Sequence, residues 1–196
     1  MNLYNYKDYR IRIEPDENSE SPDMWGNDDI FLIYQHRQFT IERAGFDVHE
    51  INKAEDEYYI FPVEAYIHSG ISLSLFNGTR SCRFDSSVSG YVLVRKTSFS
   101  EEDSVKVAES LISDWNMYLN GEVSGYIIEK PKTTYSITKE EFDKNLLEGT
   151  TIRDLESKFS ISTEWEEVDS CWGYYGDPND ICLSEAKEII DSLLNV

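Results

Sequence analysis

Three apolar runs separated by short turn sequences constrain the fold of this chain most. Residues 58–67, 71–76 and 91–94 have the lengths and the aromatic and β-branched content of strands. His68-Ser69-Gly70 and Asn77-Gly78 lie between these runs, and turn sequences of this kind favour antiparallel neighbours. Residues 61–100 contain only two acidic residues, Glu64 and Asp85, so we expect a nearly neutral, β-rich middle with acidic flanks.

Helix signals follow this β-rich segment. Residues 100–120 begin with Ser100 as a capping residue and carry apolar side chains at helical spacing, among them Leu111, Ile112 and Trp115. Residues 138–147 begin with Thr138 and Glu141 at capping-box spacing. A short helical turn is expected at 151–159 and a C-terminal helix at 184–194, with Ala186, Ile189, Ile190, Leu193 and Leu194 facing the core.

Strands at 9–13, 30–34, 123–128 and 162–168 complete the expected secondary structure, and 123–128 is expected to return to the sheet of the middle segment. Strands precede most of the helices, which is typical of an α+β fold. The sequence therefore predicts one acidic α+β domain over 1–196, with a mainly antiparallel sheet and about three helices packed on it. Residues 14–29 are expected to form an acidic loop, and 138–160 are expected to form a helical excursion.

The charge excludes several partners. Asp and Glu total 38 against 18 Lys and Arg, for a formal net charge of −20. Such a surface repels nucleic acid and anionic membrane and favours cationic partners. Three cysteines, Cys82, Cys171 and Cys182, lack the spacing of a disulfide framework. With no apolar leader segment and no run long enough to span a membrane, we expect a cytoplasmic protein.

Three clusters of small, polar and aromatic residues fall where strands are expected to end, and binding sites often lie there. They are 68–70, 82–90 and 169–177. One hypothesis makes Cys82 a nucleophile, His68 its base and Asp85 the orienting group. The alternative is a turn histidine, a small buried cysteine and a capping aspartate. Because no nucleophile signature is present, we assign no catalytic residue and expect a non-enzymatic protein.

No metal or cofactor is expected, since the cysteines and histidines match no metal-ligand spacing. Trp172, Tyr174 and Tyr175 lie among glycines, where they either stack on a ligand or form a tight turn packed on the core. The acidic coat is either a means of solubility or a mimic of nucleic acid, because duplex DNA presents roughly one charge per 1.7 Å. The candidate binding residues are Asp23, Asp28, Asp29, Glu164, Glu166, Glu167, Asp169, Trp172, Tyr174 and Tyr175.

The order of the motifs supplies a context. His68-Ser69-Gly70, the 82–90 cluster, 121–126 and 169–176 together resemble a family of small acidic proteins encoded by phages and integrative elements of Gram-positive bacteria. This resemblance covers roughly residues 58–177. It implies an accessory protein that counters host defence, and hence a DNA-mimicking inhibitor of a basic restriction or CRISPR protein in the bacterial cytoplasm. The alternative is a small-molecule-binding or hydrolytic domain whose pocket is formed by the three clusters.

Overall fold

The structure is a computed structural model of the chain and describes residues 1–147 and 159–195. It is an α+β fold with two sheets, and the predicted class is confirmed. The strands are β1 Asn2–Tyr6, β2 Tyr9–Pro15, β3 Ile30–Gln35, β4 Thr40–Ile41, β5 Tyr58–Ile67, β6 Ile71–Leu75, β7 Ser86–Arg95, β8 Val123–Ser136 and β9 Ser160–Tyr175. The α-helices are α1 Glu101–Leu119, α2 Lys139–Leu147 and α4 Ile181–Leu194, and the 3-10 helices are η1 Pro22–Trp25 and η2 Ile51–Ala54.

The chain forms two compact units. One unit contains 15–124 and 172–178, and the other contains 1–14, 125–171 and 179–196. The first unit is built on a five-stranded sheet of order β4-β3-β7-β5-β6, in which neighbouring strands pair antiparallel. The other sheet has four strands in the order β1-β2-β8-β9.

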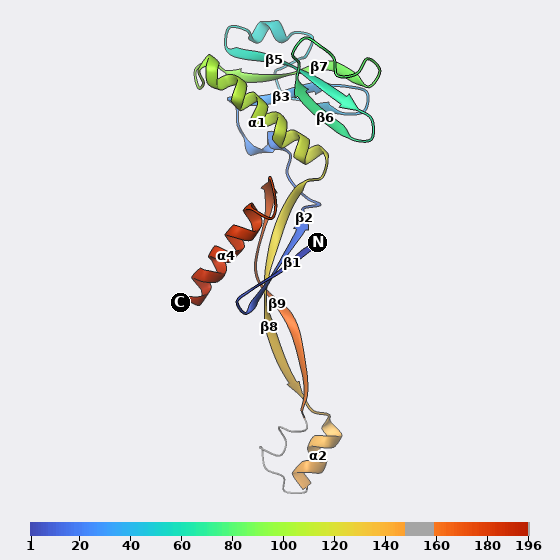
Figure 1. Cartoon of the computed structure of the whole chain (residues 1–196), viewed down its shortest axis with the longest axis vertical. Coiled ribbons are helices and arrows are strands. Elements are labelled where there is room, and N and C mark those ends of the chain that lie inside the picture. Colours follow the sequence, from blue (N-terminus) through green and yellow to red (C-terminus); the bar gives the residue numbers. More distant parts are fainter. Residues whose placement is uncertain (148–158, 196) are drawn as a thin grey trace. The chain divides into compact units, whose positions relative to one another are not determined.

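Both faces of the five-stranded sheet are covered. One face carries α1 (Figure 1), which packs through the buried Ile112 and Trp115 as the helical spacing predicted. On the other face Phe31 and Tyr58 pack with residues of the segment after β4, including Ile51 of η2. Side chains on both faces of this sheet are therefore withdrawn from water, which is the main source of its stability.

Local signals set the ends of α1. The side chain of Ser100 accepts a hydrogen bond from the N–H of Asp103, and three acidic residues follow the cap. Beyond the helix, Gly121 has φ of 68°, a left-handed conformation that favours glycine. The capping box of α2 is also confirmed, because Thr138 Oγ1 accepts from the N–H of Glu141 at 3.3 Å.

Several expectations about the four-stranded sheet and the C-terminal helix were wrong. The 123–128 segment joins the sheet of β1 and β2 rather than that of the middle segment, and β8 runs on to Ser136. In α4 the buried residues are Cys182, Ala186 and Ile190, whereas Leu193 and Leu194 are exposed because they lie on the last turn. The strand β1 was not predicted at all. The helical turn expected at 151–159 falls almost entirely outside the described residues.

The outer part of the β8–β9 hairpin is exposed on both faces. The burial of β8 changes from buried over 123–129 to exposed over 130–136, and β9 is exposed over 160–167. The helix α2 follows β8 at the end of this two-stranded ribbon (Figure 1). None of the described helices is long and apolar enough to cross a membrane.

Candidate functional site

The first two sequence clusters meet at Asp85. His68 lies in the turn between β5 and β6, and the N–H of Ile67 donates to the carbonyl of Asp85 at 2.8 Å. The carboxylate Oδ2 of Asp85 is 3.5 Å from Cys82 Sγ and 3.9 Å from His68 Nδ1. The structure thus brings together all three residues of the catalytic hypothesis.

The contacts among these three groups differ from those of a catalytic nucleophile and its base, which are joined by a direct hydrogen bond. The thiol of Cys82 donates to Asp85, and the carboxylate stands beside both other groups. Among the described residues, no hydrogen bond joins Cys82 to His68. The side chain of His68 is 70% exposed, so it is held by few neighbours. This geometry fits a turn held by Asp85 better than it fits a histidine that activates a thiol.

The loop that contains Ser81 and Cys82 is held by the buried carboxylate of Glu64, which is not among the residues selected from the sequence. Glu64 on β5 is 3% exposed and accepts hydrogen bonds from Ser81, at 2.9 Å from its N–H and 2.7 Å from its hydroxyl. Burial acts to raise the pKa of Glu64, but hydrogen bonds from Ser81 and Ser86, together with the charge of Arg80, outweigh it and leave the pKa lowered. The signal was present, since Glu64 is one of two acids in a neutral β-rich segment.

Gly90, at the end of the second cluster, has a packing role. A Cβ at this position would lie 2.2 Å from Cδ2 of Tyr34 and 2.5 Å from the carbonyl oxygen of Ile33. The ring of Tyr34 is fully buried and its hydroxyl donates to the carbonyl of Ser87 at 2.7 Å. The glycine is therefore needed for the close approach of β3 and β7.

The third cluster was expected to be a turn at a strand end, and this was wrong. Residues up to Tyr175 continue β9, with Gly173 at φ of 85° inside the strand. The ring of Tyr175 makes an edge contact with Trp25 of η1 at a centroid distance of 4.8 Å, and its hydroxyl donates to the carbonyl of Glu20. Burial, with smaller contributions from nearby Tyr118 and acidic residues, raises the pKa of Tyr175 to about 12.

The common rim expected of the three clusters gains no support from the described residues. No hydrogen bond, ion pair or ring contact joins Trp172 to His68 or Asp85 there, because β9 carries the tryptophan along a strand rather than around a turn. Trp172 is 43% exposed, and Tyr174 is half-buried. Asp169 accepts a hydrogen bond from the N–H of Ser170 at 2.9 Å.

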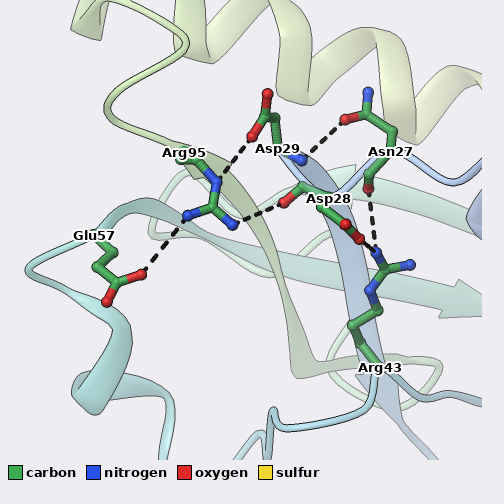
Figure 2. A network of polar contacts seen from close by, with 6 residues as sticks. All are labelled: Asn27, Asp28, Asp29, Arg43, Glu57 and Arg95. Atoms are coloured by element: carbon green, nitrogen blue, oxygen red, sulfur yellow. Dashed lines mark hydrogen bonds and ion pairs between the residues drawn. The ribbon is translucent and has the colours of Figure 1, made fainter.

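Two of the acids selected as binding residues are already paired within the chain, as Figure 2 shows. Asp29 Oδ1 lies 2.8 Å from Nε of Arg95, whose Nη1 is 3.7 Å from Glu57. The carboxylate of Asp28 forms an ion pair with Arg43. These pairs lower the charge that the two aspartates can offer to a partner. Asp23 also has a local contact, since it accepts from the hydroxyl of Ser21.

Among the acids of the ribbon, one forms an ion pair within the described part of the chain and two do not. Glu166 Oε1 lies 2.9 Å from Nζ of Lys132, and this hydrogen bond lowers the pKa of Glu166 and raises that of Lys132. Glu167 accepts from the hydroxyl of Ser170 at 2.9 Å. Glu164 is exposed, and among the described residues it has no ion-pair partner within 4.0 Å. Glu164 and Glu167 are thus the ribbon acids available to a cationic partner.

Sequence reasoning missed the acidic segment that follows β4. Its six acids are Glu42, Asp47, Glu50, Glu55, Asp56 and Glu57, all exposed. They accompany the aromatic residues Phe46 and Tyr58, which face a pocket of about 360 Å³. The signal that could have found this segment is its density of acids, six from Glu42 to Glu57, next to Phe46 and Tyr58.

In the described part of the chain, no group of three or more His, Cys, Asp or Glu is arranged to hold a metal ion. The chain matches no protein-family model, no curated protein and no solved structure. The resemblance to small acidic proteins of mobile elements therefore stays an expectation.

Proposed function

We propose that this protein is an acidic, nucleic-acid-mimicking inhibitor that occupies the basic cleft of a host defence protein of the restriction or CRISPR type, on behalf of a phage or mobile element. The observation that carries the proposal is the excess of 38 acidic over 18 basic residues on a folded framework. A rigid set of carboxylates can replace phosphates in a cleft lined by Lys and Arg.

The proposal needs carboxylates that are held in place without being neutralised. Glu101 and Glu102 meet this need, because they are exposed on the first turn of a capped helix and have no ion-pair partner among the described residues. Glu164 meets it on the ribbon. Each exposed pair with a partner's cation contributes only about 0–1 kcal/mol, so affinity depends on many such pairs acting together and on fast electrostatic association.

Capture of a partner from a host lysate, followed by binding measurements across a salt series, tests this function. We expect affinity to fall steeply with salt, DNA or RNA to compete, and the double variant Glu101→Lys/Glu102→Lys to associate more slowly. The matched control is Glu101→Gln/Glu102→Gln, which removes charge without reversing it and should have a smaller effect. Binding that ignores salt and coexists with bound nucleic acid would contradict the proposal.

A hydrolytic or small-molecule-binding function is the second candidate, and the meeting of His68, Cys82 and Asp85 favours it. A turnover assay with activated esters tests it. If the function is hydrolytic, Cys82→Ser abolishes turnover and leaves the melting temperature unchanged. Equal rates for the parent chain and this variant would remove Cys82 from consideration.

A further inference from the structure

The pocket beside η2 has an aromatic wall held rigidly by the core. The rings of Phe46 and Tyr58 meet edge to face at a centroid distance of 5.7 Å. Phe31 packs behind both, at 4.6 Å from Phe46 and 5.6 Å from Tyr58. Tyr58 is 5% exposed and Ile51, also on the pocket wall, is 7% exposed. Because Phe31 and Tyr58 belong to the covered sheet and Phe46 and Ile51 pack against them, the wall is formed before any ligand arrives.

Three carboxylates share the lining with this wall. Asp47 holds its own turn by accepting from the N–H of His49 at 2.8 Å. Glu50 lies 2.5 Å from Nζ of Lys53, and Glu57 lies 3.7 Å from Nη1 of Arg95. Three acidic groups thus face one ammonium group of the lining, Lys53. The pocket lining combines two aromatic side chains with three carboxylates and one ammonium group, which suits an organic cation.

The chain itself shows which cation such surroundings hold. The guanidinium of Arg95 lies 4.8 Å from the centroid of the Tyr58 ring while it pairs with Asp29 and Glu57. The guanidinium of Arg43 lies 5.3 Å from the Phe31 ring centroid while it pairs with Asp28. Figure 2 shows both arginines among these carboxylates. Two members of the aromatic cluster therefore already hold a guanidinium with a carboxylate beside it.

We infer that this pocket binds the guanidinium group of an arginine side chain carried by another protein or peptide. Its volume of about 360 Å³ is at the small end of ligand sites, which span about 300–1,000 Å³, and so suits a side chain. A planar guanidinium stacks on a ring and donates to carboxylates in a fork, whereas an ammonium group does neither as well. The inference goes beyond the inhibitor function, because the pocket takes arginine whichever protein presents it.

Titration of the full chain with N-acetyl-arginine amide tests the pocket without any partner protein. The readout is the aromatic NMR signals of Phe46 and Tyr58. We expect saturable shifts with the arginine probe, binding about tenfold weaker with the lysine probe, and no binding with the neutral citrulline probe. Equal shifts with the arginine and citrulline probes, or no saturable shift with arginine, would overturn the inference.

Two variants and a matched control locate the site. Asp47→Asn/Glu50→Gln removes two pocket charges but keeps a side-chain oxygen at position 47 that can accept from the N–H of His49. The fold should therefore persist while arginine binding weakens about tenfold. Glu55→Gln/Asp56→Asn removes the same charge from the same segment outside the pocket and should leave binding within about twofold. Lys53→Met removes the competing ammonium group and should tighten binding. Equal weakening by both double variants would refute a defined site.

The source of the guanidinium is settled by a second pair of probes. An N-acetyl-Gly-Arg-Gly amide should bind at least as well as N-acetyl-agmatine, which carries the same single positive charge, since the pocket opens at the surface. Binding of N-acetyl-agmatine with exclusion of the blocked peptide would overturn the assignment to a protein partner. If the chain captures no partner from a host lysate but still binds the arginine probe, the result would count against the inhibitor function alone.

Discussion

The two sheets of this protein differ in how they are covered. In the five-stranded sheet both faces are packed, by α1 on one side and by the segment of Phe46 and Ile51 on the other. In the four-stranded sheet, β8 and β9 extend into a ribbon whose side chains are mostly exposed. Aromatic and β-branched residues therefore contribute more to folding stability in the five-stranded sheet than in the ribbon. Tyr34 is fully buried, whereas Tyr135 is 62% exposed.

The contrast between the sheets shows where acidic residues can be tolerated and used. Inside the covered sheet, the carboxylate of Glu64 needs the two donors of Ser81 to offset its burial. Just before β3, Asp28 and Asp29 are matched by arginines. On the ribbon, Glu164 and Glu167 need no such partners because water solvates them. Glu164 and Glu167, like Glu101 and Glu102 on the first turn of α1, therefore remain available to a cationic partner.

The largest contrast is expected between an apolar residue of each region. Trp115→Ala should destabilise the protein by about 3–5 kcal/mol, because it removes a side chain that is 4% exposed between α1 and the sheet. Ile161→Ala on the ribbon, where the side chain is 65% exposed, should change stability by no more than about 0.5 kcal/mol. Urea denaturation followed by circular dichroism measures both. Comparable losses would mean that the ribbon is packed in solution.

A smaller effect is expected at the glycine that lets β3 and β7 approach. Gly90→Ala should cost about 1–3 kcal/mol, since its Cβ would overlap the buried ring of Tyr34. Gly70→Ala is the matched control, because its Cβ would meet only the side-chain oxygen of Asn120 at 3.2 Å, and the change should stay within about 1 kcal/mol. If thermal melting ranks the two variants in the opposite order, the close approach is not the reason for Gly90.

The buried carboxylate should make the covered sheet sensitive to acid. The pKa of Glu64 in the folded chain is below its ordinary value of 4.5, so its ionised form stabilises the fold above that pH. This contribution is lost as the pH falls through the folded-state pKa, when the carboxylate takes up a proton. Glu64→Gln should cost about 1–3 kcal/mol at pH 7, because one acceptor is lost beside Ser81.

The same variant should also lose part of the acid sensitivity. Unfolding measured between pH 7 and pH 3 should show a smaller decrease for Glu64→Gln than for the parent chain. Asp56→Asn, an exposed carboxylate in the same unit, is the control and should keep the parental pH dependence. Parallel pH profiles for the parent chain and Glu64→Gln would show that Glu64 does not contribute to the acid sensitivity of the fold.

The smallest effects on folding are expected from reversal of surface charge. Asp28→Lys/Asp29→Lys should cost roughly 1–2 kcal/mol in total, because it breaks pairs with Arg43 and Arg95 and places like charges beside them. Glu164→Lys/Glu167→Lys should leave stability unchanged, because neither acid pairs with a cation among the described residues. Thermal melting at low salt measures the difference, which should shrink as salt screens the charges. Equal melting temperatures for the two double variants would show that the arginine pairs contribute little.

Much of the covered sheet could be predicted from the sequence, because its signals are local. The strand over 58–67 and the helix over 100–120 agree with β5 and α1 almost residue for residue. Turn residues and a capping serine act within a few positions of the chain, so no distant partner is needed to interpret them. The excess of acidic residues is also a property of composition alone.

Part of the candidate site could be inferred in the same way. His68 and Asp85 were selected as residues beside strand ends, and the antiparallel pairing of β5 with β7 brings them to within 3.9 Å. The contacts of Arg95 with Asp28 and Asp29 could not be inferred. Arg95 is 67 positions from Asp28 in the chain and reaches both residues only through the pairing of β3 with β7. Nor could the sequence show that β9 replaces the turn expected at 169–176 with a strand.

The α+β class, the capped helix α1 and the net charge of −20 follow from the order and composition of the amino acids. Three features instead depend on how the chain folds in space. They are the assignment of strands to sheets, the pairing of carboxylates with arginines, and the pocket that Phe46 and Tyr58 share with Asp47. The physical reason is the range of the forces. Caps and turns depend on neighbouring residues, whereas burial and ion pairing depend on groups that only folding brings together.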